Sequence, residues 1–290
     1  MLGRLVRELW AYGQCMKARI LHVFPYAWFA LGGILIASRC RPPLLQTFEA
    51  VVAMYAIGTS AYAFNDAMDL ELDKVNQVVN PLTGGKVSEK EALRLAAVSA
   101  VVGMLLSYAI SLEAFALGLV YLTLGFMYST PQIYLKRRLL GKTFVAAIGI
   151  AISYLFGGAS IGVISTSLLY IAGLMFAVAV AFNPLMDLPD LEGDMKRGCK
   201  TLAIMLGAKL SVEFATVILI STAVFTTIYS YLFGLGLMLP LLVGRFCLSS
   251  IWTAYPLLKL DQDPKYGKRM LRIIFPIQML FQAGLILTTL

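Results

Sequence analysis

Long apolar segments, separated by short polar ones, make up most of the chain. Nine such segments, with bounds uncertain by several residues, cover residues 21–38, 45–64, 92–110, 114–127, 143–163, 167–184, 212–233, 235–258 and 271–290. Most are near the roughly 20 residues that a helix needs to cross the hydrocarbon core of a bilayer. They lack the short alternating segments of an outer-membrane barrel. The pattern predicts an all-α, polytopic membrane protein of about nine transmembrane helices.

Composition agrees with this fold class and excludes several functions. Of 290 residues 59% are hydrophobic and only 14% are charged, and the mean hydropathy of +0.80 exceeds that of soluble domains. The single histidine, His22, cannot form a metal site alone and is interpreted as packing at the membrane interface. The four cysteines are scattered without a Cys-x-x-Cys pair, which argues against a zinc site and a disulfide framework; they are Cys15, Cys40, Cys199 and Cys247.

Positive charge is concentrated in particular loops. The net charge of +8 is attributed to the excess of Lys and Arg in cytoplasmic loops rather than to nucleic-acid binding. Residues 1–20 alternate basic side chains with Leu5, Leu9 and Trp10, which predicts an amphipathic helix on the membrane surface. We expect the N-terminus, which shows no removable signal peptide, to be cytoplasmic, together with both acidic loops and the loops at 136–142 and 259–272.

An acidic motif ends the second apolar segment. Residues 65–73 read Asn-Asp-Ala-Met-Asp-Leu-Glu-Leu-Asp. On a helix Asp66, Asp69 and Asp73 share one face, and their like charges are stabilised when a cation lies between them. Oxygen-only ligands suit magnesium, which commonly joins carboxylates to substrate phosphates. A solvated loop after a membrane segment is the alternative interpretation.

The same spacing returns after the sixth apolar segment. Asp187, Asp190 and Asp194 repeat the Asp-x-x-Asp-x-x-x-Asp pattern at the same kind of boundary, which weakens the solvated-loop interpretation. Basic residues that suit a phosphate follow both motifs; they are Lys74, Lys196, Arg197 and Lys200. The repetition suggests a pair of magnesium-binding faces turned toward one diphosphate.

The order of the segments also repeats. Two spans, an acidic loop, two spans and a basic loop describe residues 21–142 and again 143–272. We therefore predict one membrane domain over residues 1–290, built as a duplicated four-helix unit around a central cavity, with residues 271–290 as the last helix. Arg245 lies inside the eighth segment, where a charge is expensive. Arg245 either has a functional role or is accommodated structurally, by extending to the membrane surface or by pairing with a residue of another helix.

These residues resemble a known family, the UbiA-type intramembrane prenyltransferases. Residues 65–73 match its Asn-Asp-x-x-Asp-x-x-x-Asp motif, and residues 187–194 match its second motif. The Lys-Thr-Leu at 200–202 also resembles a segment that follows the second motif in this family, and Tyr-Ser-Thr-Pro at 128–131 looks like the family's third loop. Family members often carry Arg-Pro before the following glycine turn, where this chain has Asn80-Pro81.

The resemblance implies transfer of a prenyl group from a polyprenyl diphosphate to an acceptor nucleophile, with Mg²⁺ as cofactor. It places Asp69, Asp73, Asp190 and Asp194 in catalysis, and these four with Asn65, Asp66 and Asp187 around the metals. Candidate contacts to diphosphate or acceptor are Lys142, Lys196, Lys200, Arg19, Arg137 and Tyr128. Aromatic candidates for stabilising an allylic cation are Tyr62, Phe64, Tyr121, Tyr128 and Phe182.

For the acceptor, we favour an aromatic compound by a small margin over an ether lipid. An aromatic acid such as 4-hydroxybenzoate would need a cation, for which Arg137 is a candidate, and the Tyr-Ser-Thr-Pro loop favours this quinone-type reaction. The Glu-Gly-Asp ending of the second motif favours instead a digeranylgeranylglyceryl phosphate synthase acting on an ether lipid. A transporter of an anionic lipid and a prenyl diphosphate hydrolase are further alternatives. The sequence predicts neither prenyl chain length nor oligomeric state.

Overall fold

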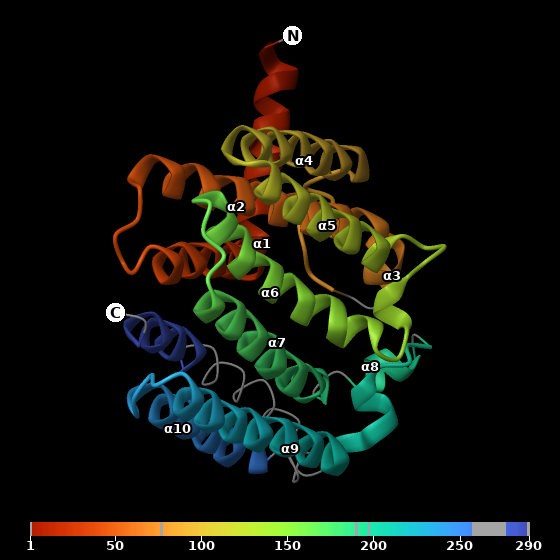
Figure 1. The fold of residues 1–290 in the computed structure, drawn as a ribbon. Coiled ribbons are helices and arrows are strands. Elements are labelled where there is room, and N and C mark those ends of the chain that lie inside the picture. Colours follow the sequence, from red (N-terminus) through yellow and green to blue (C-terminus); the bar gives the residue numbers. More distant parts are fainter. Residues whose placement is uncertain (1, 76–77, 189–190, 197, 257–276, 289–290) are drawn as a thin grey trace. The chain divides into compact units, whose positions relative to one another are not determined.

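The computed structural model describes residues 2–75, 78–188, 191–196, 198–256 and 277–288, and the regular elements among these residues are all helical (Figure 1). They are α1 (Leu2–Ala37), α2 (Leu44–Met68), α3 (Leu70–Val75), α4 (Glu89–Ile110), α5 (Leu112–Ser129), η1 (Leu135–Arg137), α6 (Gly141–Ser160), α7 (Thr166–Asp187), α8 (Leu191–Lys196), α9 (Leu202–Leu232) and α10 (Met238–Ala254). A further helix covers Ile277–Leu287. The all-α prediction is confirmed.

Six of the described helices are long and apolar enough to cross a membrane, and they lie in α1, α4, α5, α6, α7 and α9. Together they make the chain a multi-pass membrane protein. α10 and Ile277–Leu287 are apolar but shorter. α2 is not among the six, and its sequence contains polar residues such as Glu49, Asn65 and Asp66. The predicted count of nine spans is therefore not confirmed within the described residues.

Two helices are longer than the sequence pattern predicts. The surface helix predicted for 1–20 and the span predicted for 21–38 form one continuous helix, α1, which runs through Pro25. In an apolar environment, continuing a helix keeps most backbone groups paired, which favours the single element. The seventh predicted span begins at Leu202 instead of 212, and Gly207 interrupts it with a φ of 68° and a ψ of −179°. Only glycine adopts that backbone conformation readily.

Two compact units are present, and each is described by itself. One comprises residues 1–135 and 152–168, and the other comprises 136–151 and 169–290. The division falls within α6 and α7 rather than at residue 142, where the sequence analysis placed the boundary between repeats. The duplicated four-helix unit remains a prediction.

α2 forms the centre of the first unit. It packs against α1, α4 and α5, and its buried positions are mostly small, including Ala50, Ala53 and Gly58. Small residues let helix backbones approach closely where lipid supplies no hydrophobic driving force. α1 approaches the second half of α6 in the same way, since a Cβ on Gly33 would collide with the carbonyl oxygen of Tyr154.

Aromatic stacking organises the second unit. The rings of Phe246 on α10 and Phe281 on the 277–287 helix stack with centroids 3.8 Å apart, and Phe182 on α7 lies 6.1 Å from Phe246. Tyr170 on α7 stacks on Tyr229 of α9 at 3.9 Å. These contacts hold α7, α9, α10 and the last helix together, with α7 carrying the second acidic motif at its end.

We predict that Gly33→Ala destabilises the protein, because the new methyl group meets a backbone carbonyl that no side-chain rotation can move away. Overpacking of this kind typically costs about 1–3 kcal/mol, so thermal unfolding in detergent should begin at a lower temperature. Gly13→Ala in the same helix is the matched control, since nothing lies within 4 Å of its Cβ position. It should be neutral or stabilising. Equal unfolding temperatures for both variants would contradict the close approach.

Candidate active site

The first acidic motif lies where α2 ends and α3 begins. Asp69 follows the last residue of α2, and its N–H donates to the carbonyl of Asn65 at 3.0 Å. The N–H of Asp73 donates to the carbonyl of Asp69 at 2.7 Å. These bonds keep helical spacing across the junction, as the sequence pattern predicts. The motif therefore presents its polar side chains at the polar end of an otherwise apolar element.

Asp69 is held from both sides. Its Oδ2 accepts a hydrogen bond from the Asn65 amide at 3.0 Å, and its Oδ1 accepts one from the Tyr134 hydroxyl at 3.1 Å. The same amide group of Asn65 donates to the hydroxyl of Ser129, the last residue of α5, at 2.8 Å. Asp69 and Ser129 are buried. This network fixes the orientation of the Asp69 carboxylate.

Asp66 has a different partner from Asp69. Nε of Arg19 donates to its Oδ2 at 3.0 Å, and a terminal nitrogen of the same guanidinium pairs with its Oδ1. Asp66 is only 2% exposed, and the Arg19 side chain is 24% exposed. Both oxygens of this predicted metal ligand therefore face a guanidinium, which was itself a candidate contact to the diphosphate. The fork geometry makes this a strong, specific pair.

A group of aromatic rings adjoins this ion pair through Tyr62. The Arg19 guanidinium lies 6.0 Å from the ring of Tyr62, and Tyr62 also lines a pocket beside Asp66. Tyr26 connects two of the predicted aromatic candidates, since its ring lies 6.3 Å from Tyr62 and 5.4 Å from Tyr121. His22 packs against Tyr62 at 5.9 Å. A cluster of π faces therefore adjoins the first motif.

The loop after α3 is tied back to the motif. The Asn80 amide donates to Oδ2 of Asp73 at 3.0 Å, while its Oδ1 accepts from the N–H groups of Leu82 and Thr83 at 2.9 Å. Arg7 of α1 donates to the carbonyl of Lys86 at 2.9 Å. Asn80 occupies the position where the family often has Arg, and here it positions Asp73.

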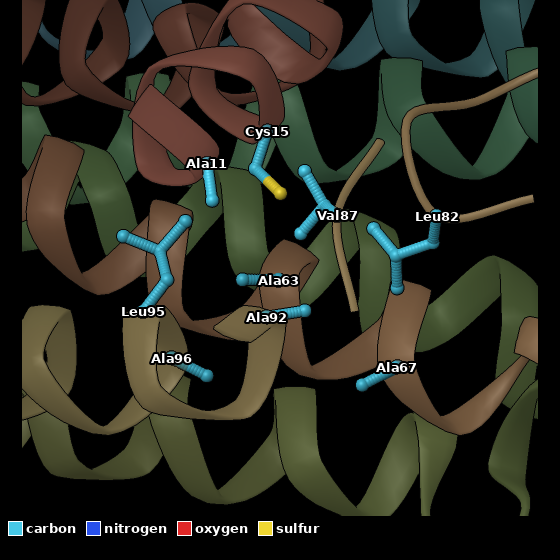
Figure 2. Close-up of a cluster of buried hydrophobic side chains, with 9 residues drawn as sticks. All are labelled: Ala11, Cys15, Ala63, Ala67, Leu82, Val87, Ala92, Leu95 and Ala96. Atoms are coloured by element: carbon cyan, nitrogen blue, oxygen red, sulfur yellow. The ribbon is translucent and has the colours of Figure 1, made fainter. Parts of the chain in front are cut away.

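A buried apolar cluster anchors the same loop. Figure 2 shows loop residues Leu82 and Val87 among side chains from α1, α2 and α4. The remaining members are Ala11, Cys15, Ala63, Ala67, Ala92, Leu95 and Ala96. Because Ala63 and Ala67 belong to the last turns of α2, this packing fixes the helix end that carries the motif.

The second motif is organised by a lysine. Nζ of Lys142, near the start of α6, lies 2.8 Å from Oδ1 of Asp187 and 3.3 Å from Oδ2 of Asp194. Asp187 ends α7, Asp194 lies in α8, and both are buried. Asp190 lies outside the described residues, as does the side chain of Lys196. One ammonium group therefore joins two of the predicted metal ligands.

The remaining predicted residues are placed as follows. Arg137 lies in η1, and its carbonyl accepts a hydrogen bond from the N–H of Lys200 at 3.1 Å, which brings two predicted contact residues together. The Lys200 side chain is exposed. Tyr128 is the penultimate residue of α5, next to Ser129. Arg245 is exposed on α10 beside exposed Leu241 and Leu248, so its functional role remains a prediction.

Comparison with known proteins identifies the family. The model of the UbiA prenyltransferase family matches residues 26–275. The chain belongs to this family. It is 30% identical over 217 residues to a digeranylgeranylglyceryl phosphate synthase of Sulfolobus acidocaldarius, covering 74% of this chain and 77% of that protein.

Solved structures share the UbiA fold. A structure of a digeranylgeranylglyceryl phosphate synthase has a TM-score of 0.77 and 20% identity, covering 97% of this chain and 98% of that one. A UbiA homologue from Archaeoglobus fulgidus bound to GPP and Mg²⁺ has a TM-score of 0.74 and 17% identity, covering 96% of this chain and 99% of that one. At these identities the likeness concerns the fold alone.

The donor chemistry of both UbiA motifs fits Mg²⁺. Asn65, Asp69, Asp73, Asp187 and Asp194 offer oxygen atoms only, which a hard cation prefers. The contact of one ammonium with two carboxylates of the second motif shows that these side chains can share a cation. Among the described residues no three His, Cys, Asp or Glu side chains form a ready-made metal cluster. The carboxylates of this UbiA chain are arranged around cationic and amide side chains instead.

Ser129 and Tyr134 are site residues that the sequence analysis did not select. Ser129 lies in the stretch that resembles the third UbiA loop and contacts Asn65, and Tyr134 follows that stretch and contacts Asp69. Tyr134 adopts a φ of 47°, which is uncommon for a residue other than glycine. From the sequence, Tyr134 shows only that it has a side chain able to form hydrogen bonds. The loop conformation decides that this side chain contacts Asp69.

We predict that Asp66→Asn destabilises this UbiA chain more than Glu71→Gln. The first change leaves the partly buried guanidinium of Arg19 without a carboxylate, and removing one partner of a buried pair costs on the order of 3 kcal/mol. Glu71 is 85% exposed, and its one ion pair among the described residues is with neighbouring Lys74, so the loss of its charge should have little effect on stability. Thermal unfolding in detergent measures both.

A double-mutant cycle sharpens this test. Arg19→Met combined with Asp66→Leu removes both charges, so it should cost less than the sum of the two single changes. If the destabilisation of the double variant equals the sum for the two single variants, Arg19 and Asp66 do not stabilise the protein through their interaction.

Proposed function

We propose that this protein is a Mg²⁺-dependent prenyltransferase that moves a polyprenyl group from its diphosphate to a glycerol-phosphate ether lipid, as a digeranylgeranylglyceryl phosphate synthase does. The observation that carries the choice of acceptor is the 30% identity to such a synthase over 74% of the chain. The Glu-Gly-Asp ending of the second motif and the following Lys-Thr-Leu agree with it.

The aromatic acceptor that the sequence analysis favoured has weaker support. That preference rested on the Tyr-Ser-Thr-Pro loop at 128–131. Ser129 from this loop contacts Asn65, and Tyr134 shortly after it contacts Asp69. These contacts assign the loop to the motif that we place at the diphosphate. It is therefore a poor indicator of the acceptor, and the relatives favour the ether lipid.

Each motif has a defined part in the proposed reaction. Asn65, Asp69 and Asp73 of the first motif and Asp187, Asp190 and Asp194 of the second would hold Mg²⁺. When bound there, Mg²⁺ would supply positive charge to offset the charge that builds on the diphosphate as the allylic C–O bond breaks. Ser129, Tyr134 and Asn80 orient the first set of ligands before substrate arrives. This preorganisation reduces the reorganisation needed in the transition state.

Other side chains would handle the organic part of the reaction. Breaking the C–O bond leaves an allylic cation, which aromatic faces stabilise without adding a nucleophile. Tyr26, Tyr62 and Tyr121 supply such faces near Asp66. Arg137 and Lys200, joined through their backbones, are our candidates for the phosphate of the acceptor. An apolar environment around the cation limits its capture by water.

Residue Asp66 receives a supporting part in this proposal. Its two oxygens are occupied by the Arg19 fork, so we place it as the residue that anchors α1 to the motif helix rather than as a metal ligand. The cytoplasmic side of the membrane remains the predicted location of both motifs, on the positive-inside argument.

We expect purified protein in detergent to transfer radiolabelled geranylgeranyl groups from the diphosphate to geranylgeranylglyceryl phosphate, and not to 4-hydroxybenzoate. Chelation of Mg²⁺ should abolish the product. Asp69→Asn should lower turnover by about a hundredfold or more, because it replaces a charged carboxylate of the proposed metal site by a neutral amide. Glu71→Gln, an exposed carboxylate two residues before Asp73 that contacts only Lys74 in the described structure, is the matched control and should retain activity.

Each other outcome selects an alternative. Product from 4-hydroxybenzoate alone would restore the aromatic acceptor. Mg²⁺-dependent loss of diphosphate to water, with no product from either acceptor, would favour a hydrolase. No turnover of the diphosphate under any condition would count against an enzyme and favour the transporter.

A further inference from the structure

Each acidic motif receives a cation from the helix that precedes its own. Arg19 of α1 pairs with Asp66 on α2, 47 residues later in the chain. Lys142 of α6 pairs with Asp187 on α7 at a similar separation. Asp66 and Asp187 are the first aspartates of their Asp-x-x-Asp-x-x-x-Asp patterns. The two cations are therefore in equivalent places, one in each compact unit.

Their chemistry differs in a way that matters for metal binding. Arg19 uses two nitrogens on the two oxygens of one carboxylate, which fixes a planar geometry. Lys142 places one ammonium between two carboxylates, at 2.8 Å from Asp187 and 3.3 Å from Asp194. An ammonium is a compact, strongly hydrated charge on a flexible stem, so it exchanges partners more readily than a guanidinium fork.

We propose that Lys142 is a resident counter-ion of the second motif, which Mg²⁺ displaces from Asp187 and Asp194. This inference deepens the proposed function and relies on its assignment of both aspartates as metal ligands. The buried carboxylates would repel each other without a cation, and Lys142 relieves that repulsion in the metal-free protein. Since the ammonium and the metal neutralise the same charges, each must weaken binding of the other.

The surroundings of Lys142 allow this exchange. Its side chain is 27% exposed, so the ammonium has access to solvent when it leaves the carboxylates. The backbone that carries it stays in place, because neighbouring Thr143 donates a hydrogen bond to Asn183, one turn before Asp187 on α7, at 3.3 Å. The displaced ammonium would remain close to the metal ligands, where the proposed diphosphate adds negative charge.

The test measures metal binding without any substrate. Mn²⁺ serves as the probe, and electron paramagnetic resonance counts the unbound ion during titration of the full-length protein in detergent. We expect Lys142→Gln to bind Mn²⁺ about five- to thirty-fold more tightly than the wild type, because a competing cation is gone. Lys142→Arg should bind it more weakly than the wild type, because a fork holds carboxylates more firmly.

A second readout covers the metal-free state. Lys142→Gln should unfold at a lower temperature than the wild type in the presence of EDTA, and added Mn²⁺ should recover more of its stability. Lys209→Gln is the matched control, because Lys209 is 80% exposed on α9 and lies 4.0 Å from Glu213. It should change neither metal affinity nor unfolding. If Lys142→Gln does not fold, the expected weakening in Lys142→Arg still decides the proposal.

The outcomes separate this inference from the proposed function. Unchanged Mn²⁺ affinity in both Lys142 variants would overturn the counter-ion role, even if the wild type transfers prenyl groups. Weaker Mn²⁺ binding in Lys142→Gln would also overturn it. Tighter binding in that variant supports the inference, and it does so even if no acceptor is prenylated and the proposed function fails.

Discussion

Negative charge at the end of an apolar helix must be balanced, and the structure is organised around that constraint. A buried carboxylate without a partner is costly because little water reaches it. Asp66 is balanced by the guanidinium of Arg19 and Asp187 by the ammonium of Lys142. Each partner comes from the same compact unit as its aspartate. The first aspartate of each motif therefore has a cationic partner within its own unit.

At the first motif, neutral amides and hydroxyls orient carboxylates instead of balancing their charge. Asn65, Ser129 and Tyr134 form one hydrogen-bonded network around Asp69, and Asn80 supports Asp73. These groups orient the carboxylates without cancelling their charge, so the carboxylates keep their attraction for a cation. The apolar cluster under the loop keeps the same network in place (Figure 2). Packing and polar contacts therefore both fix the orientation of the oxygen atoms of the first motif.

Shared chemistry and acceptor choice depend on different parts of a UbiA chain. In the proposed reaction, the contacts of Ser129 with Asn65 and of Tyr134 with Asp69 link the third loop and the residues after it to the first motif rather than to the acceptor. A residue that positions the ligands of the diphosphate is needed whatever the prenyl group is transferred to. Similarity along the whole chain therefore carries more weight for the acceptor than one loop does.

The sequence by itself determined the helical membrane fold, the family and the acidic motifs, because hydropathy and residue spacing are local properties. The described helices follow the apolar segments closely, as α4 and α5 show. It did not determine the partners of the motif residues. Arg19 is 47 residues from Asp66 and Tyr134 is 65 from Asp69, so only tertiary packing decides that one aspartate contacts a guanidinium and the other a phenol. The helix bounds also depended on structure, because α1 runs without a break through the surface helix and the first span that the sequence pattern separated.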